Sequence, residues 1–181
     1  KTDNQFTIVH ISSLLDSHKN VSGMLRAAKE IENRIGEFEW KFIGGVESRY
    51  KELIEELQFS KAKITFIDHV SQSELVKHLQ QANLFVLFSN YENLPCVILE
   101  SFSCGVPVIS TDVGGIKEYF PEGFGSLVSK QNESELADEI EVFYNNSSAS
   151  TIEMHDYATN NFSKKAIAEN FSVIYDKTLK G

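Results

Sequence analysis

The sequence predicts an α/β fold, a Rossmann-like parallel sheet of about six strands with helices on both faces. Short runs rich in β-branched and aromatic residues alternate with stretches in which apolar residues recur at helical spacing. The run LFVLFS (84–89) is continuously apolar, as is typical of parallel strands that are covered on both faces. Because no repeat or low-complexity linker interrupts this alternation, residues 1–181 are expected to form a single domain.

The first half of the chain contains three predicted strands, namely FTIVHIS (6–12), WKFIG (40–44) and KITFID (63–68). Helical apolar spacing follows the first two strands, in Met24, Ala28, Ile31 and Ile35 and then in Tyr50, Leu53, Ile54 and Leu57. Ser71 and Glu74 form a capping box, which predicts that a helix begins after the third strand.

The second half repeats the pattern, with strands predicted at 84–89, 106–111 and 125–129. A short helix is predicted at 97–104, ended by Gly105, and Asn132 is expected to cap another helix. Residues 144–150 are expected to form a loop before a final helical region. Its last helix, 163–179, is capped at Ser163.

The expected strand order is 3-2-1-4-5-6, in which the chain changes direction between the first and fourth strands. Ligands bind such sheets beyond the carboxyl ends of the strands at this switch point. The loops that would meet there are residues 12–20 and 89–96. The sequence therefore predicts a ligand site between these two loops.

Three charged residues in or beside these loops are the candidate site residues. Lys19 suits a phosphate site next to a helix N-terminus, although a solvated surface lysine is the simpler interpretation. Glu92 and Glu100 would each accept hydrogen bonds from vicinal hydroxyls, as sugars present them. The alternative for Glu100 is a charge favoured by the dipole at the start of its helix. Together the three suit a ligand with hydroxyls at two ends and phosphate between them.

Composition excludes several other classes of function. A net charge of −9 argues against nucleic acid as a partner. The five histidines and two cysteines show no metal-ligand spacing, so neither a metal nor a cofactor is expected. The first turn lacks G-x-G-x-x-G, and no P-loop or nucleophile elbow is present. With no signal-peptide pattern and no apolar run of membrane-spanning length, the expected location is cytoplasmic.

The stretch SNYENLPCVILESFSCGVPVISTDVGG (89–115) resembles the E-x7-E region of retaining GT-B glycosyltransferases of family four, also called group 1. Members typically read S-x-x-E-G-F-G, an apolar stretch ending in L-E-A, C-G-x-P-V-I and D-V-G-G. The matching positions here are Glu92, Leu99-Glu100, Cys104-Gly105, Pro107-Val108-Ile109 and Asp112-Val113-Gly114-Gly115. The spacing is ungapped, and the resemblance extends over nearly the whole chain.

The resemblance implies a role for each candidate residue. Glu92 corresponds to the residue that contacts the donor sugar near the transferring carbon and is the catalytic candidate, and Glu100 to the one that holds the ribose. Lys19 corresponds to the diphosphate lysine and Val70 to a position near the nucleobase. The amides of Leu94 and Cys96 occupy positions that meet the sugar or phosphate.

Two positions depart from the family pattern. The family usually has Gly-Arg after the first strand, where this chain has Ser12-Ser13, so a hydroxyl replaces the guanidinium that would clamp phosphate. The G-F-G turn is replaced by Asn93-Leu94-Pro95, and Pro95 has no N–H to donate. Both changes bear on donor affinity and donor choice.

The resemblance implies a donor-binding domain that uses a UDP- or GDP-sugar and transfers the sugar to an acceptor hydroxyl with retention. The implied setting is bacterial-type polysaccharide or glycolipid synthesis. The acceptor would bind a missing N-terminal half, toward which helix 163–179 would pack and through which the enzyme would associate peripherally with a membrane. The chain alone is then expected to be inactive.

Other functions remain open on the same fold. A non-catalytic nucleotide-sugar-binding module is favoured by Ser13, and a nucleotide-sugar epimerase would share the two-domain architecture. A phospho-receiver domain would need paired acids after the first strand and a lysine after the fifth. Ser12-Ser13 and Ser110-Thr111 contradict that reading.

Overall fold

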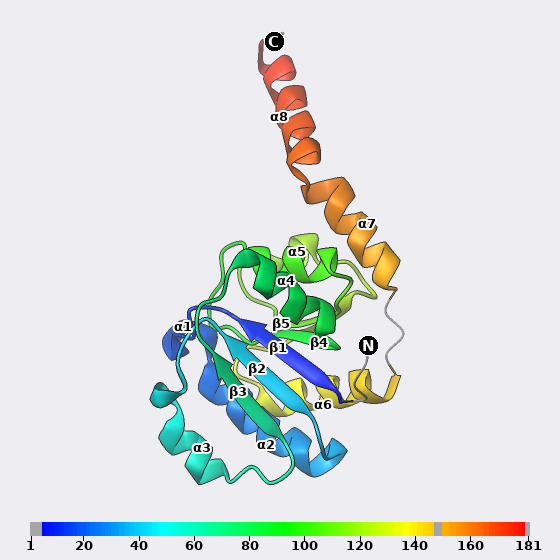
Figure 1. The fold of residues 1–181 in the computed structure, drawn as a ribbon. Helices are drawn as coiled ribbons and strands as arrows, with labels where there is room; N and C mark the ends of the chain where they lie inside the picture. Colours follow the sequence, from blue (N-terminus) through cyan, green and yellow to red (C-terminus); the bar gives the residue numbers. More distant parts are fainter. Residues whose placement is uncertain (1–4, 147–149, 180–181) are drawn as a thin grey trace.

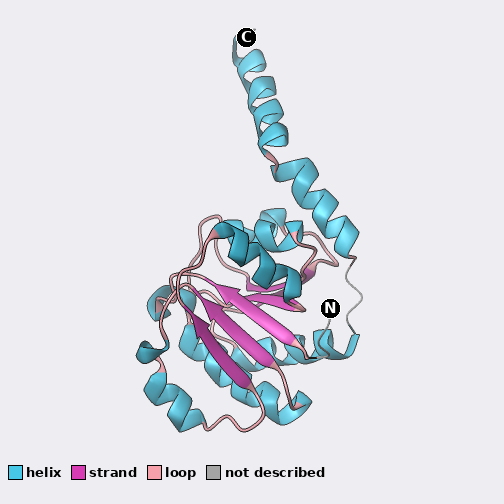
Figure 2. Cartoon of the chain, viewed as in Figure 1, coloured by secondary structure: helices cyan, strands magenta, loops and turns pink. Residues whose placement is uncertain are grey.

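The computed structural model describes residues 5–146 and 150–179, and these form a six-stranded parallel sheet flanked by helices (Figures 1 and 2). The strand order is β3-β2-β1-β4-β5-β6, and every neighbouring pair is parallel. The predicted fold class and strand order are therefore confirmed.

The strands lie within one or two residues of their predicted positions. They are β1 (Thr7–Ile11), β2 (Glu39–Ile43), β3 (Lys63–Ile67), β4 (Leu84–Leu87), β5 (Val108–Thr111) and β6 (Gly125–Val128). The α-helices are α1 (Asp16–Lys19), α2 (Val21–Ile35), α3 (Lys51–Leu57), α4 (Gln72–Gln81), α5 (Cys96–Ser103), α6 (Glu133–Asn146), α7 (Thr151–Phe162) and α8 (Lys164–Leu179). Two short 3-10 helices, Glu47–Arg49 and Ile116–Tyr119, complete the set.

The sheet separates two apolar cores because successive side chains of each strand point to opposite faces. In β1, Ile8 belongs to the core under α2, α3 and α6, whereas Val9 belongs to the core under α4, α5 and α7. Neither residue has any exposed surface, and the same is true of all four residues of β4. The continuous apolar run of β4 therefore fills both layers, as its sequence predicted.

The helix boundaries agree with the predicted capping residues. Ser71 accepts a hydrogen bond from the Glu74 amide while Glu74 accepts from the Ser71 amide, so the predicted capping box is present. Asn132 caps α6 by accepting from the Glu135 amide. Ser163 caps α8 by accepting from the Ala166 amide.

One loop boundary was predicted wrongly. Residues 144–146, expected in a loop, continue α6, and residues 147–149 lie outside the described residues. The rings of Tyr144 and Phe6 pack edge to face, with their centroids 5.2 Å apart. Phe143 also packs against the core next to β1. These two contacts extend the helix through a stretch whose polar sequence favours a loop.

The last helix, α8, extends away from the sheet and contacts the rest of the described chain through α7 (Figure 1). Its exposed apolar residues are Ile167, Phe171, Val173, Ile174, Tyr175 and Leu179. A monomeric surface rarely gathers so many large apolar side chains on one helix. No helix in the described part of the chain is long and apolar enough to cross a membrane.

A buried carboxylate joins α2 to the chain segment before β3. Glu32 Oε1 accepts hydrogen bonds from the amides of Ser60, Lys61 and Ala62 at 2.6, 2.5 and 2.8 Å, and Oε2 pairs with Lys29 Nζ at 2.5 Å. Burial disfavours the ionised form, but the Lys29 ammonium and the three amides outweigh it, and the pKa of Glu32 falls to about 2.

We predict that Glu32→Gln lowers the free energy of unfolding at pH 7 by about 2–3 kcal/mol, because an amide replaces a buried, charged acceptor of four hydrogen-bond donors. Chemical denaturation measures the change. The contribution of Glu32 is complete above its unfolded pKa, near 4.5, and is lost as the pH falls toward 2. Glu30→Gln, at an exposed ion pair on the same helix, is the control and should cost under about 0.5 kcal/mol. Equal losses in both variants would contradict this role of Glu32.

Candidate functional site

The loops after β1 and β4 meet beyond the carboxyl ends of their strands. The Asn90 amide N–H donates to the His18 carbonyl at 2.7 Å, and its side-chain Nδ2 donates to the Ser17 carbonyl at 3.2 Å. Gln131 Nε2 donates to Asn90 Oδ1 at 3.0 Å. Asn90 therefore holds α1 against the loop that carries Glu92, and the predicted meeting of the two loops is confirmed.

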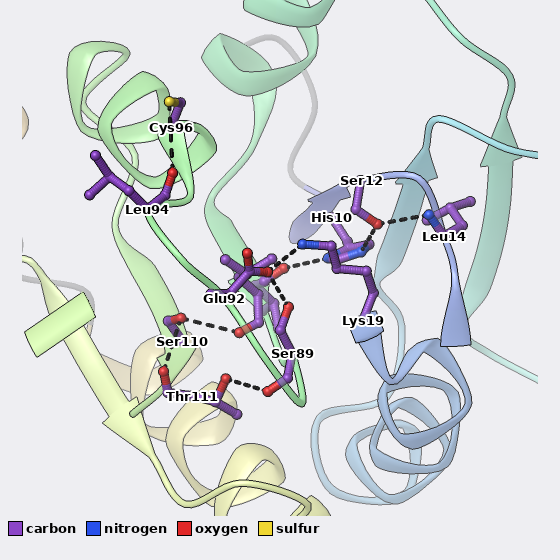
Figure 3. Close-up of polar contacts among 12 residues, drawn as sticks. His10, Ser12, Leu14, Lys19, Ser89, Glu92, Leu94, Cys96, Ser110 and Thr111 are labelled. Atoms are coloured by element: carbon purple, nitrogen blue, oxygen red, sulfur yellow. Dashed lines mark hydrogen bonds and ion pairs between the residues drawn. The ribbon is translucent and has the colours of Figure 1, made fainter. Parts of the chain in front are cut away.

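Lys19 and Glu92 form an ion pair across this junction (Figure 3). Ser89 Oγ donates a second hydrogen bond, at 2.6 Å, to the same Glu92 oxygen. The Glu92 side chain is 8% exposed and that of Lys19 is 20% exposed, so Glu92 is a largely buried carboxylate and not a surface loop residue. The structure brings together two of the residues that the sequence singled out.

The neighbouring strand β5 supports the backbone around Glu92. Thr111 Oγ1 donates to the Ser89 carbonyl at 2.8 Å. Gly114, with φ of +60°, packs so closely that a Cβ there would lie 2.2 Å from the Glu92 carbonyl oxygen. The turn at Gly114 thus allows a close approach of the two backbone segments.

The buried residue His10 connects β1 to β4 within the core. A carbonyl only accepts, so His10 Nδ1–H donates to Val86 O at 2.8 Å and Nε2 accepts from Ser12 Oγ at 2.7 Å. Ser12 Oγ in turn accepts from the Leu14 amide at 3.0 Å. Leu14 has φ of +52°, so these contacts hold a backbone conformation that leucine rarely adopts. His10 therefore packs in the core and also orders the loop that leads to Lys19.

The start of α2 is already occupied by a side chain of this chain. Lys19 is the last residue of α1, and Asn20, with φ of +48°, turns the chain into α2. Asp16 Oδ1 accepts from the Ser22 amide at 2.7 Å. The prediction that Lys19 adjoins a helix N-terminus holds, but a carboxylate of the chain itself bonds an amide of that first turn. Ser13 is exposed nearby.

The other predicted residues lie around the N-terminal half of α5. Leu94 is 55% exposed and Cys96, the first residue of α5, is also exposed. Pro95 is the N-cap and provides no side-chain hydrogen bond to the first turn. The amides at this helix start therefore lack a side-chain cap, as a site for an anionic group would.

Glu100 differs from the sequence expectation in one respect. It is the fifth residue of α5, beyond the first turn, so the interpretation as a charge favoured by the helix start is wrong. Its half-buried carboxylate accepts from Gln72 Nε2 at 3.2 Å, which links α5 to the start of α4. Val70, two residues before Gln72, is half-buried against the core under α4 and α5. Val70 and Glu100 thus come from adjoining elements.

Sequence reasoning missed the hydrogen-bonding roles of Ser12, Ser89 and Asn90 and the buried hydroxyl of Tyr119. Asn90 bonds Ser17, 73 positions away, whereas Ser12 and Ser89 bond residues two and three positions away, and all three small polar side chains carry no signal in a single sequence. The buried Tyr119 hydroxyl has no hydrogen-bond partner among the described residues. Burial, aided by the negative charge of Glu92, raises the pKa of Tyr119. Within the described residues no cluster of three His, Cys, Asp or Glu side chains could hold a metal ion.

The fold and the site define the chain as a Rossmann-like α/β domain with charged loops at its switch point. The sequence model of the family described as "Glycosyl transferases group 1" matches residues 1–165. The chain therefore belongs to this glycosyltransferase family. A sulfoquinovosyl transferase of Arabidopsis thaliana is 30% identical over 115 residues, which cover 64% of this chain and 21% of that protein.

Solved glycosyltransferase structures share the fold. The sucrose-phosphate synthase of Thermosynechococcus elongatus superposes with a TM-score of 0.83 and 23% identity over 98% of this chain and 46% of its own. The pneumococcal O-GlcNAc transferase GtfA, in complex with UDP and GlcNAc, does so with a TM-score of 0.77 and 20% identity over 97% and 36%. The fold is the Rossmann-like fold of GT-B glycosyltransferases, and the chain spans less than half the length of these proteins.

The buried neutral His10 predicts a pH dependence of stability. Burial, opposed by the hydrogen bond to Val86 and aided by the charge of Lys19, lowers its pKa from 6.5 to about 4. Between these values the unfolded chain binds more protons, so stability falls as the pH falls. We expect His10 to account for a loss of about 2 kcal/mol in the free energy of unfolding between pH 6.5 and 5.

Urea unfolding at the two pH values measures this loss in the wild type and in His10→Gln. Between the two pH values His10→Gln should lose about 2 kcal/mol less than the wild type does, whatever its absolute stability. His78→Gln is the control, because partial burial also lowers the pKa of His78 and its removal should leave the contribution of His10 in place. An unchanged pH dependence in His10→Gln would show that His10 is not the titrating group.

Proposed function

We propose that this chain is the nucleotide-sugar-binding domain of a retaining glycosyltransferase that moves a sugar from a UDP- or GDP-sugar to an acceptor hydroxyl. The observation that carries the proposal is the Lys19–Glu92 pair at the switch point, between two loops that match the family's spacing. Family membership supports sugar transfer in general. The donor-binding role and retention are specific to the proposal.

Each part of the donor has a matching group along this edge of the sheet. Lys19 and the uncapped start of α5 would bind the diphosphate, because a cation and exposed amides favour an anion. Glu92, buried between Lys19 and Ser89, would accept hydrogen bonds from sugar hydroxyls. Glu100 would accept from the ribose, and Val70 on the adjoining element would contact the base.

The chemistry follows from this arrangement. Glycosyl transfer passes through an oxocarbenium-like transition state while the diphosphate departs with growing negative charge. Lys19 and the α5 amides would stabilise that charge more strongly in the transition state than in the ground state, which is the condition for catalysis. Glu92 would orient the sugar beside the transferring carbon, and no nucleophilic role is assigned to it.

We further propose that the acceptor binds a second domain, which completes the site. The chain covers 46% of the sucrose-phosphate synthase chain and 36% of the O-GlcNAc transferase chain, which supports a larger whole protein. The exposed apolar side chains of α8 would pack against that second domain. Polysaccharide or glycolipid synthesis is the proposed setting, with peripheral membrane association through the second domain.

A non-catalytic nucleotide-sugar-binding module is the second candidate. Exposed Ser13 supports it, since a hydroxyl there stabilises a departing diphosphate less well than a guanidinium would. An assay of the two-domain protein with nucleotide sugar and acceptor distinguishes these candidate functions by their products. Glycosylated acceptor indicates a transferase, isomerised donor an epimerase, and binding without turnover a non-catalytic module.

We expect the chain alone to bind a nucleoside diphosphate but to transfer no sugar. The acceptor groups would lie on the second domain, so bound donor would have no positioned nucleophile other than water. Incubation of the chain with radiolabelled nucleotide sugars and a mixture of sugar acceptors tests this. Acceptor labelling by the chain alone would contradict the assignment of acceptor binding to another domain.

We predict that Lys19→Met and Glu100→Gln each weaken nucleoside diphosphate binding by about 1.5–3 kcal/mol, because each removes a charge-assisted hydrogen bond. Isothermal titration of the chain with UDP and GDP measures the effect. Lys51→Met is the matched control, because Lys51 is an exposed lysine of α3 whose ion pair with Glu55 is long, at 3.8 Å. Unchanged affinity in both site variants, with the fold intact by circular dichroism, would contradict the proposed donor site.

A further inference from the structure

The charge at the proposed donor site is already balanced within the chain. Lys19 Nζ pairs with Glu92, and among the described residues the hydrogen-bond partners of the Glu92 carboxylate are Lys19 and Ser89. In and beside the adjacent loop, Ser13 is a hydroxyl, His10 is buried and neutral near pH 7, and the Arg49 guanidinium is bonded to the Leu14 carbonyl. A diphosphate that engages Lys19 must therefore compete with a carboxylate for one positive charge.

The cost to Glu92 of losing Lys19 differs between a bound nucleotide sugar and a bound nucleoside diphosphate. A bare diphosphate draws Lys19 toward itself and leaves the Glu92 carboxylate, 8% exposed, with one hydroxyl donor and an anion close by. Loss of the opposite charge from a buried ion is strongly unfavourable. A nucleotide sugar brings hydroxyl donors to the same carboxylate, so the hydrogen bonds that Lys19 gives up are replaced.

We propose that Glu92 makes this site discriminate between the nucleotide sugar and the nucleoside diphosphate that remains after transfer, by competing with the diphosphate for Lys19. The inference rests on the proposed function and adds to it a residue that sets ligand preference. It also assigns the Lys19–Glu92 pair a role in product release, since loss of the sugar leaves the diphosphate opposite an unsatisfied carboxylate.

The geometry makes the pair able to act in this way. Lys19 is 20% exposed at the end of α1, so its long side chain can move toward a ligand. Glu92 has two contacts that do not involve Lys19: Ser89 Oγ donates to its carboxylate, and Gly114 packs against its main-chain carbonyl, while Thr111 holds the Ser89 carbonyl. The carboxylate therefore keeps the Ser89 hydroxyl as a partner when the lysine moves.

The test compares the ratio of dissociation constants, nucleoside diphosphate over nucleotide sugar, in the wild type and in Glu92→Gln. The probe pairs are UDP with UDP-glucose and UDP-N-acetylglucosamine, and GDP with GDP-mannose, measured by isothermal titration. Glutamine keeps the shape of the side chain and removes its charge. We expect Glu92→Gln to bind the bare diphosphate at least tenfold more tightly than the wild type does and to lower the ratio by a similar factor.

Two further variants make the result specific. Glu100→Gln is the matched carboxylate change. It should weaken both members of a pair equally and leave their ratio unchanged, because both carry the ribose. Lys19→Met with Glu92→Gln removes both partners, and it should bind the bare diphosphate more weakly than Glu92→Gln alone because the cation is gone. A melting curve for each variant checks that it folds.

The outcomes separate the two levels of the proposal. If no probe pair binds the wild-type chain, the proposed function fails and the inference fails with it. If the wild type binds and Glu100→Gln weakens both ligands, but Glu92→Gln leaves the ratio unchanged, the donor site stands and the discrimination by Glu92 is overturned. A lowered ratio in Glu92→Gln with an unchanged ratio in Glu100→Gln supports the inference.

Discussion

The parallel pairing of β1 with β4 is the constraint on which the site depends. It aligns Ile8 with Leu84 and Val9 with Phe85 at the centre of the sheet, where the direction of strand addition reverses. The loops that leave the two strands consequently emerge side by side. The Lys19–Glu92 pair, the Asn90 contacts with α1 and the His10 bond to Val86 all connect the β1 side of the site to the β4 side.

These contacts restrict the Glu92 side chain more than the Lys19 side chain. Glu92 is confined by a hydroxyl, by the neighbouring strand and by a glycine against its carbonyl, whereas Lys19 is held by the end of a short helix. A fixed carboxylate opposite a mobile cation can exchange partners when an anion arrives. A pair that was rigid on both sides would exclude the anion, because its charges would remain neutralised by each other.

The loop after β1 shows how the chain accommodates its departure from the family pattern. Ser12 occupies a position where the family usually has glycine, and its hydroxyl is used internally, between His10 and the Leu14 amide. Tyr50 and Arg49 both donate to the Leu14 carbonyl, at 2.6 and 2.9 Å. The backbone at Leu14, which has φ of +52°, is thus stabilised by hydrogen bonds on both its amide and its carbonyl.

The sequence alone determined the elements and their order, because apolar periodicity and capping residues act over a few positions. The capping box at Ser71, the buried run of β4 and the switch-point loops all followed from such patterns. The end of α6 did not, since Tyr144 is helical through a contact with the distant Phe6.

Only the tertiary structure decided how the candidate site residues are related. Glu92 and Glu100 stand at the two ends of one short sequence motif, yet one pairs with Lys19 from the loop after β1 and the other with Gln72 from α4. Lys19 and Glu92 are separated by 73 positions, so no local pattern records their contact. Local sequence fixes which face a side chain takes, whereas the partner it finds depends on how whole strands and helices pack.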